Sequence, residues 1–393
     1  MTARPLKVFV GMSGGVDSSV SAALLQQAGY NVTGVFIKVW SPDWLPCTWK
    51  DERRDAMRVA ARLNIPFLTF DFEKEYKKEV VDSMLADYEH GLTPNPDVLC
   101  NKEIKFGSFL RKALRMGADF VASGHYAQSI RPMAAVSKDS KSSGFVHQKG
   151  RRPDLSFLDT SATSHVILRE GADKQKDQRY FLWTLTQEQL SHVLFPVGDL
   201  QKSEVRKLAK KFSLSTAEKK DSQGICFIGD VEMREFLEHY IPKKSGHVLD
   251  EKGEVVGRHD GAVFYTLGER HGFEITKKTP RDQPYYLVAK DIRKNTLTVS
   301  QKIAEDSLKT VREVTLCDIN WISEKPKENK IYLARFRYRQ EPQVCLFARS
   351  DKATSAKTAT ARIIFQNPQQ AVSPGQSLVL YDAERVLGGG VIM

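Results

Sequence analysis

The sequence has no Cys-x-x-Cys pair and no apolar run long enough to cross a membrane. Its five cysteines, Cys47, Cys100, Cys226, Cys317 and Cys345, stand far apart from one another. This spacing excludes the common zinc and iron–sulfur ligand patterns, so we expect no metal site built from cysteines. An odd cysteine count argues against a disulfide scaffold. Because only six residues precede the first apolar strand, we expect no signal or transit peptide, no membrane contact and a cytoplasmic protein.

The composition is that of a folded protein with a basic charge balance. Hydrophobic residues make up 41% of the 393 residues, and this length favours two or three domains. Lysine and arginine number 59 against 48 aspartates and glutamates, which gives a net charge of +11. This excess indicates either a polyanionic partner such as nucleic acid or simply a basic enzyme. Charge alone leaves these two interpretations open.

A loop of small residues joins the first strand to the first helix. Residues 11–18 read GMSGGVDS and lie between an apolar strand at 7–10 and a helical pattern at 19–28. In this position backbone N–H groups converge on an anion, and the helix N-terminus adds positive potential. Val16 and Asp17 stand where a Walker A loop needs Gly and Lys, and the glycines lack the spacing of a dinucleotide-binding turn. The remaining alternative is an ordinary connecting turn.

Strands and helices alternate in the first part of the chain, which predicts βαβ units and a parallel sheet covered on both faces, an α/β domain. We expect strands at 31–40, 67–72 and 119–123, and helices at 51–63, 73–90, 102–116 and 203–212, with a capping box at Thr186–Gln189. Ligands bind beyond the carboxyl ends of such strands, where residues 11–18 and 123–125 fall. Residues 131–164, rich in Ser, Lys, Arg and Asp, are expected to form a flexible insertion.

The second half of the chain changes character. We expect an α/β domain at 1–212, a small mixed central module at 213–283 and a C-terminal β-barrel at 284–393. The strands expected after residue 284 are 285–290, 296–300, 330–339, 343–348, 358–365 and 377–381. The strand at 330–339 places Arg335, Arg337 and Arg339 on one face. That face is interpreted either as a solvated charged surface or as a phosphate-binding strip.

Two cysteines lie in segments with unusual surroundings. Cys100 ends the loop TPNPDVLC at 93–100, whose prolines restrict the backbone just before an expected helix. The positive end of that helix favours a thiolate, and Asp97 is close enough in sequence to relay a proton. Cys226 lies next to small residues in DSQGICFIG at 221–229. A buried structural cysteine is the alternative at both positions, and Cys47 is interpreted in that way.

Together these segments resemble those of one enzyme family. The loop at 11–18 is similar to the PP-loop of N-type ATP pyrophosphatases, which split ATP into AMP and pyrophosphate. The whole chain resembles the tRNA-specific 2-thiouridylases, which replace the 2-oxygen of the wobble uridine with sulfur in tRNAs for Lys, Glu and Gln. The matching segments are GMSGGVDSSV, LTPNPDVLCNKEIKFG, SGHY, KDQRYFL, LFPVGDL, KKDSQGICFIG, YTLGERHG, RFRYRQ, PGQS and LGGG. The match is poorest at 131–164.

The resemblance implies a role for each matching residue. The residues expected to bind ATP are Gly11, Met12, Ser13, Gly14, Gly15, Val16, Asp17, Ser18, Ile37 and Gly124. Asn95, Pro96 and Asp97 are expected to meet the target base. The residues expected to contact tRNA are His125, Lys176, Asp177, Gln178, Arg337, Tyr338 and Gln376. Ile37 stands where the family has methionine, an apolar exchange that preserves packing.

The implied reaction couples ATP cleavage to sulfur transfer. Adenylation makes the 2-oxygen a leaving group, and the terminal sulfur of a persulfide on Cys226 attacks the base carbon. Cys100, the expected nucleophile, then attacks the inner sulfur and leaves a disulfide. Asp97 is expected to act as general base and Mg²⁺ to offset the phosphate charge. The implied partners are tRNA and a cysteine desulfurase or sulfur-relay protein.

Two other functions remain open from the sequence. Another PP-loop enzyme, such as a lysidine synthetase or an argininosuccinate-type ligase, also activates an oxygen with ATP but needs no paired cysteines. A non-catalytic tRNA-binding homologue would keep the fold without the chemistry. The presence of Asp17, Cys100 and Cys226 argues against a non-catalytic homologue. A requirement for sulfur would distinguish a thiouridylase from the other PP-loop enzymes.

Overall fold

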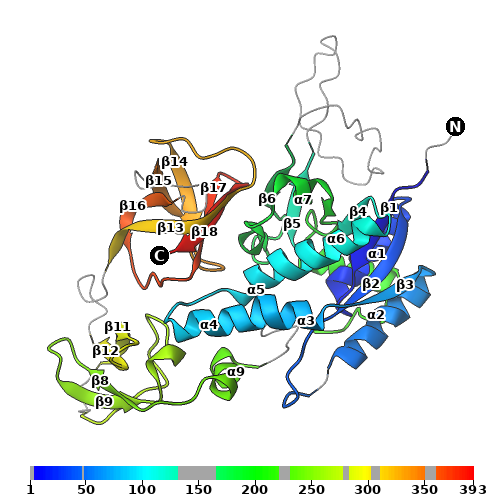
Figure 1. The fold of residues 1–393 in the computed structure, drawn as a ribbon. Helices are drawn as coiled ribbons and strands as arrows, with labels where there is room; N and C mark the ends of the chain where they lie inside the picture. Colours follow the sequence, from blue (N-terminus) through cyan, green and yellow to red (C-terminus); the bar gives the residue numbers. More distant parts are fainter. Residues whose placement is uncertain are drawn as a thin grey trace.

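Three folded units follow one another along the chain (Figure 1). The computed structural model describes residues 4–46, 48–131, 165–220, 231–277, 283–301, 310–349 and 360–393. Within these ranges no helix combines the length and the apolar character needed to span a membrane. The first unit is α/β, the second is a small mixed sheet and the third is a β-barrel, so the expected fold class is confirmed.

A five-stranded parallel sheet forms the first unit, in the order β3-β2-β1-β4-β7. Its strands are β1 (Lys7–Gly11), β2 (Asn31–Lys38), β3 (Phe67–Asp71), β4 (Phe120–Ala122) and β7 (Val193–Leu194). Successive side chains of β1 point to opposite faces. Val8 and Val10 therefore pack with α1 (Val16–Gln27), α2 (Trp49–Leu63) and α8 (Lys202–Lys211), whereas Phe9 packs on the other face.

Two longer helical runs pack on the Phe9 face of the sheet. The first consists of α3 (Glu73–Tyr76), η1 (Lys77–Asp82) and α4 (Ser83–Glu89), and the second of α5 (Pro96–Leu99), η2 (Cys100–Phe109) and α6 (Leu110–Arg115). Both η1 and η2 are π-helical. The second run begins at Pro96 rather than at 102, because the Asn95 side chain caps it. Its Oδ1 accepts hydrogen bonds from the backbone N–H groups of Asp97 and Val98 at 3.1 and 3.2 Å.

The central unit is a five-stranded sheet in the order β10-β9-β8-β12-β11, preceded by α9 (Met233–Tyr240). Its strands are β8 (Gly246–Leu249), β9 (Val255–His259), β10 (Glu274–Ile275), β11 (Tyr286–Asp291) and β12 (Thr296–Ser300). The last two were expected to open the barrel, but β12 pairs in parallel with β8 instead. Leu287, Leu297 and Val299 are buried there, so the expected boundary at 283 falls inside this sheet. Alternation predicts a strand but not which sheet it joins.

Six strands close the barrel: β13 (Val311–Trp321), β14 (Ile331–Arg335), β15 (Gln343–Arg349), β16 (Ala361–Gln369), β17 (Ser377–Asp382) and β18 (Arg385–Ile392). Closure comes from β18, which pairs with both β17 and β13. Three glycines at 388–390 permit these close approaches; a Cβ on Gly390 would lie 2.8 Å from the carbonyl oxygen of Cys317. The sequence pattern misses β18 because glycine has low strand propensity.

A hairpin of the first unit extends the barrel sheet. It is made of β5 (Ala127–Ile130) and β6 (Ile167–Glu170), and β6 pairs with β18 through Arg169 and Arg385. The stretch between the two strands includes 132–164, so the expected insertion lies outside the described residues. The capping box at Thr186 is confirmed and opens α7 (Gln187–Ser191).

The three arginines expected on one strand face do not share it. Strand β14 ends at Arg335, because the Gln340 side chain accepts hydrogen bonds from the N–H groups of Phe336 and Arg337 and closes a turn. The side chain of Arg335 is 15% exposed and lies 3.5 Å from a carboxylate oxygen of Asp177, whereas Arg337 is exposed. The expectation that the three guanidiniums share one face was therefore wrong.

A buried cluster of charges joins the first unit to the barrel. The Arg179 side chain, 3% exposed, lies 2.9 Å from a carboxylate oxygen of Asp177 and 2.9 Å from one of Glu170, and it stacks on the Tyr381 ring. Burial raises the pKa of Asp177, and the Arg179 guanidinium opposes that shift. With Arg335 of the barrel the cluster holds two cations and two anions, so its charges compensate one another.

We predict that Arg179→Met removes about 3–5 kcal/mol from the free energy of unfolding, because it leaves buried carboxylates uncompensated. Urea-induced unfolding measures the loss. The control is Arg54→Met, which breaks the exposed ion pair with Asp51 and should cost less than about 1 kcal/mol. Equal losses in the two variants would show that the cluster does not stabilise the junction.

Candidate active site

The loop between β1 and α1 is a tight turn held by its own hydroxyls. Gly14 has φ +75°, and a Cβ there would clash with the carbonyl oxygen of Glu52. The Ser18 hydroxyl lies 3.2 Å from the N–H of Ser13 and 3.3 Å from its hydroxyl, and the Ser19 hydroxyl donates to the Gly15 carbonyl at 2.7 Å. The backbone can take this shape only because small residues occupy it.

The N-terminus of α1 opens onto this loop without a side-chain cap. Its N-cap is Gly15, which has no side chain to accept a hydrogen bond from the first turn. The first N–H groups of a helix have no intrahelical partner, and the helix dipole adds positive potential there. A twelve-residue helix with this start is suited to receive phosphate oxygens.

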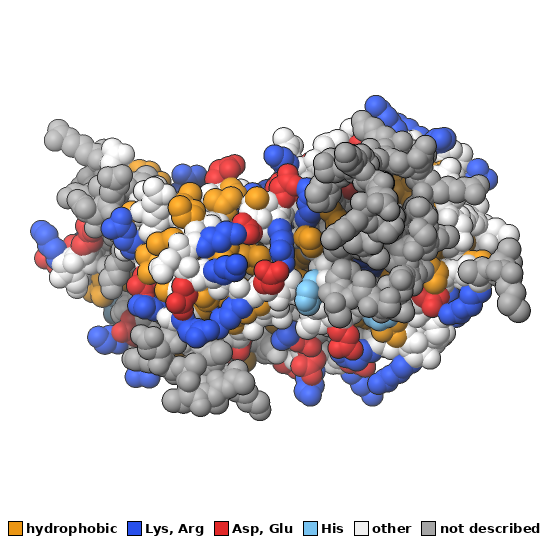
Figure 2. Space-filling model, turned by 90° about the horizontal axis from the view of Figure 1, so that it is seen from above, with side chains coloured by type: hydrophobic (Ala, Val, Ile, Leu, Met, Phe, Trp, Pro, Cys, Tyr) orange, Lys and Arg blue, Asp and Glu red, His pale blue; other side chains and the backbone are white. Residues whose placement is uncertain are grey.

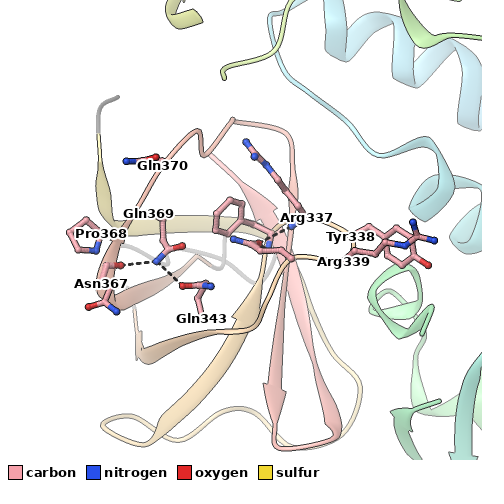
Figure 3. Close-up of a pocket in the computed structure, with 10 residues that line it drawn as sticks. Arg337, Tyr338, Arg339, Gln343, Asn367, Pro368, Gln369 and Gln370 are labelled. Atoms are coloured by element: carbon pink, nitrogen blue, oxygen red, sulfur yellow. Dashed lines mark hydrogen bonds between the residues drawn. The ribbon is translucent and has the colours of Figure 1, made fainter. Parts of the chain in front are cut away.

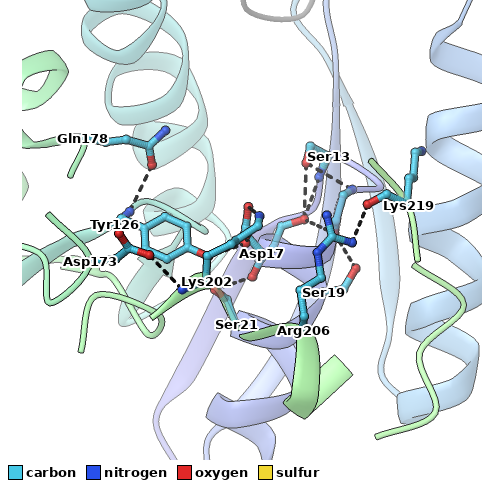
Figure 4. Close-up of polar contacts among 12 residues, drawn as sticks. Ser13, Asp17, Ser19, Ser21, Tyr126, Asp173, Gln178, Lys202, Arg206 and Lys219 are labelled. Carbon is cyan, nitrogen blue, oxygen red and sulfur yellow. Dashed lines mark hydrogen bonds and ion pairs between the residues drawn. The ribbon is translucent and has the colours of Figure 1, made fainter. Parts of the chain in front are cut away.

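Asp17, in the first turn of α1, is held by two residues from other segments (Figure 4). The Tyr126 hydroxyl donates to its Oδ1 at 2.7 Å, and Lys202 Nζ lies 2.8 Å from both of its carboxylate oxygens. Sequence reasoning missed both residues. The sequence marks these two residues only weakly. Tyr126 is the last residue of the SGHY segment, and Lys202 follows the LFPVGDLQ segment at the start of a helix.

The two expected ATP-site residues outside the loop lie against it. A Cβ on Gly124 would come within 2.7 Å of the Ser18 nitrogen and 2.8 Å of the Asp17 carbonyl carbon, so the two backbones are in close contact. The Cδ1 of Ile37 lies 3.7 Å from where a Gly11 Cβ would stand, and Ile37 is 5% exposed. The structure therefore brings together the loop, Ile37 and Gly124, while their role in ATP binding stays a prediction.

Asp97 and Cys100 lie on one helical run. They are three residues apart across α5 and the start of η2, a spacing that places their side chains on the same side of the helix. Cys100 has no exposed surface, whereas Asp97 is partly exposed. Cys100 lies just beyond the first turn, so it is further from the helix start than the sequence suggested. Cys47 and Cys226 lie outside the described residues, so their predicted roles are not placed.

The expected base-binding loop packs against the barrel. The N–H of Thr93 donates to the carbonyl of Pro374 at 2.8 Å. Beside it, the Tyr180 hydroxyl lies 2.9 Å from the carbonyl oxygen of Ser377 and 3.1 Å from that of Phe336. Burial raises the pKa of Tyr180, so its hydroxyl stays protonated and can donate to these carbonyls. Residues 93–97 thus form a junction between two units.

The residues expected to contact tRNA differ in exposure. His125 is 7% exposed, between the rings of Phe106 and Phe195, and burial lowers its pKa well below the usual value. Asp177 is buried in the charge cluster. Lys176, Gln178, Tyr338 and Gln376 are partly exposed, and Arg337 is exposed. A direct RNA contact stays a prediction for all seven residues. Two of them, His125 and Asp177, have buried side chains.

Arg337 and Tyr338 line a pocket of about 570 Å³ on the barrel (Figure 3). The pocket also includes Arg339, Gln343 and the segment 367–370. From the edge of this pocket, Tyr338 extends towards the first unit, where its ring centroid lies 4.6 Å from that of Phe181. The turn at 336–340 therefore carries an exposed cation on one side and an interdomain contact on the other.

Basic side chains do not form one continuous surface on the face viewed from above (Figure 2). Lys and Arg gather over the part of the molecule where the barrel lies, but Asp, Glu and hydrophobic side chains interrupt them. In the residues that the structure describes, no group of three or more His, Cys, Asp or Glu side chains is arranged to hold a metal ion. Although the net charge of the chain is +11, the positively charged side chains on this face therefore form separate patches.

Comparisons with known proteins cover nearly the whole chain. A family model described as tRNA methyl transferase HUP domain matches residues 6–230, a second described as tRNA methyl transferase PRC-barrel domain matches 234–301, and a third described as Aminomethyltransferase beta-barrel domain matches 311–392. The second match ends where the central sheet ends, with β12 included.

Curated relatives match over almost their full length. The tRNA-specific 2-thiouridylase MnmA of Streptococcus thermophilus is 42% identical over 391 residues, which is 98% of this chain and 95% of the relative. The protein of the same name from Alkaliphilus oremlandii is 43% identical over 393 residues, 99% of this chain and 97% of the relative. A solved U34-tRNA thiolase, NcsA of Methanococcus maripaludis, matches at 16% identity and a TM-score of 0.34 over 60% of this chain and 65% of its own.

We predict that Gly124→Ala weakens ATP binding at least about tenfold, because its Cβ would push Asp17 and Ser18 away from the loop. Isothermal titration with ATP measures the effect. The matched control is Gly390→Ala, whose Cβ would meet a backbone oxygen at a similar 2.8 Å in the barrel. Unchanged ATP affinity in Gly124→Ala would remove Gly124 from the nucleotide site.

Proposed function

The chain belongs to the tRNA-specific 2-thiouridylase family, and we propose that it thiolates the wobble uridine of tRNAs for Lys, Glu and Gln with ATP as the activating substrate. It is thus a tRNA-uridine 2-sulfurtransferase. The observation that carries the proposal is the identity of 42–43% over 98–99% of the chain. The loop geometry and the helix that holds Asp97 and Cys100 support it.

We propose that the loop at 11–18 accepts the phosphates of ATP during activation of the base. The uridine 2-oxygen attacks the α-phosphorus, an O–P bond forms, and the bond to pyrophosphate breaks. The uncapped amides of α1 face the departing anion and stabilise it. The product of this step is an adenylated carbonyl, in which AMP has become the leaving group.

Mg²⁺ fits this site as a companion of ATP rather than as a resident metal. Asp17 supplies one partly exposed carboxylate beside the loop, and Mg²⁺ is commonly held by one or two carboxylates together with substrate phosphates. When bound, it neutralises phosphate charge. A bound Mg²⁺ would be held by Asp17 together with the phosphates of ATP.

Sulfur transfer is proposed to use both cysteines. A persulfide on Cys226 attacks C2 with its terminal sulfur, a C–S bond forms, and the C–O bond breaks as AMP leaves. The Cys100 thiolate then attacks the inner sulfur, forms a Cys100–Cys226 disulfide and expels the sulfur on the base as the 2-thio product. If Cys100 attacks the inner sulfur of the persulfide before C2 has reacted, the disulfide forms and hydrosulfide is released. The hydrosulfide is then the nucleophile that attacks C2. In either order, a thiol reductant restores the two cysteines.

Asp97 is proposed as the general base, and Asn95 and Pro96 as contacts of the target base. Asp97 shares one side of the helix with Cys100, which places a carboxylate near the thiol that must lose its proton. The Asn95 Oδ1 caps the helix, and its side chain also forms a hydrogen bond with Tyr180, so Asn95 is held at the junction between this loop and the barrel. Cys100 is buried, so its attack on the inner sulfur takes place in an enclosed pocket.

We further propose that the central module and the barrel bind tRNA, that a cysteine desulfurase or sulfur-relay protein loads Cys226, and that the protein acts in the cytoplasm. The contact between residues 93–97 and the barrel supports a shared role, because RNA held on the barrel would lie next to the loop that meets its base. The wobble base must leave the anticodon stack to enter the site.

Cys100→Ser and Cys226→Ser are each expected to abolish thiolation, because neither hydroxyl can replace a thiol in disulfide exchange. Mass spectrometry of nucleosides from tRNA treated with ATP and a persulfide donor measures the product. Both variants should keep tRNA binding and ATP–pyrophosphate exchange, since activation precedes sulfur transfer. Cys317→Ser is the control, because its thiol donates to the Val391 carbonyl in the barrel. Full activity in either catalytic variant contradicts the mechanism.

Arg337→Gln is expected to weaken tRNA binding roughly three- to thirtyfold and to lower the salt dependence of binding by about one ion, because one phosphate contact is lost. Filter binding over a range of salt concentrations measures both quantities. Arg312→Gln is the matched control: Arg312 is also an exposed barrel arginine, and its guanidinium donates to the Gln366 carbonyl. Equal effects of the two substitutions would show that position 337 is not a specific contact.

A further inference from the structure

The phosphate-type loop contains no lysine, yet the structure places one beside it. We propose that Lys202 is the cation that binds the β- and γ-phosphates of ATP and the departing pyrophosphate. This inference rests on the proposed use of ATP at the loop. It assigns a substrate-binding role to a residue from α8, far in sequence from residues 11–18.

The backbone of Lys202 is fixed before its side chain reaches the loop. Lys202 is the first residue of α8, and its N–H donates to Asp173 Oδ2 at 3.0 Å. Gln201 and Glu204 form a reciprocal capping box at the same helix start. From this anchored position the side chain extends to Asp17 (Figure 4). Only the four-carbon stem remains free to redirect the ammonium group.

The ion pair between Lys202 and Asp17 differs from a structural pair in its exposure. The Lys202 side chain is 16% exposed and that of Asp17 is 30% exposed, whereas Arg179 and Asp177 in the interdomain cluster are 3% and 2% exposed. A partly hydrated pair loses less when it separates than a fully buried one. Ligand binding can therefore exchange this contact at modest cost.

Asp17 keeps a partner when Lys202 leaves it. The Tyr126 hydroxyl donates to its Oδ1 at 2.7 Å, and the backbone of Tyr126 is fixed in turn because its N–H donates to Gln178 Oε1 at 3.0 Å. The carboxylate is thus held in place by a neutral donor from a rigid segment. Lys202 can move from Asp17 to a phosphate oxygen because the carboxylate is partly exposed to water and keeps its hydrogen bond from Tyr126.

Two other cations shown in Figure 4 are engaged in contacts that hold the chain itself. Arg206 donates to the carbonyl oxygens of Ala217 and Lys219, and the Lys219 ammonium lies 2.7 Å from Asp55 Oδ2. Lys202 contacts a residue in the first turn of α1, where the uncapped amides lie. A flexible ammonium at that point suits the phosphates that become pyrophosphate.

The test compares Lys202→Met with Lys207→Met, which removes the same charge from an exposed position on the same helix. Isothermal titration in Mg²⁺ measures the binding of ATP, pyrophosphate and AMP. We expect Lys202→Met to weaken ATP and pyrophosphate binding roughly ten- to hundredfold, the range for a lost hydrogen bond to a charged group, and to leave AMP binding within about threefold. Lys207→Met should bind all three as the wild type does.

Lys202→Gln separates a charge effect from a folding effect, because its amide can still hydrogen-bond Asp17 without carrying charge. The same selective loss of ATP and pyrophosphate binding in this variant supports the proposal. Wild-type affinity for pyrophosphate in either variant, or an equal loss for AMP, overturns it. If the wild type itself binds neither ATP nor AMP, the failure belongs to the proposed function instead.

Discussion

The close packing of three backbone segments around residues 11–18 is the constraint on which the rest of the site depends. Gly14 fits beneath the Glu52 carbonyl, and Gly124 lies against the backbone of Asp17 and Ser18. These contacts fix the direction of α1, so its uncapped N–H groups converge at the carboxyl end of β1. A side chain at either glycine would change that direction. The anion site is therefore a property of backbone geometry, and the charged residues Asp17 and Lys202 are added to it.

The same unit is tied to the barrel by two kinds of contact. The charge cluster around Arg179 links residues 170–179 to β14, and Thr93 and Tyr180 bind barrel carbonyls at the loop that precedes Cys100. An RNA bound on the barrel would thus be held at a fixed position relative to Asp97 and Cys100. This arrangement gives the C-terminal unit a part in placing the base, beyond adding basic surface.

Local patterns predicted much of the first unit. Strand–helix alternation gave β1 to β4, the capping box gave α7, and small residues at a strand-to-helix turn indicated the loop. They failed where the outcome depends on distant partners. Alternation could not show that β11 and β12 join the central sheet, and glycine at 388–390 concealed β18. The expected strand through Arg339 failed because the Gln340 side chain ends it with a turn. Tyr126 and Lys202 reach Asp17 only through the fold.

The function proposed for this chain is to supply the 2-sulfur of wobble uridine in tRNA. The most direct measurement is mass spectrometry of wobble nucleosides in tRNAs for Lys, Glu and Gln from cells that lack the protein. We expect 2-thiouridine derivatives to disappear at this position and to return when the intact gene is restored. An unchanged amount of 2-thiouridine in cells without the protein would contradict it.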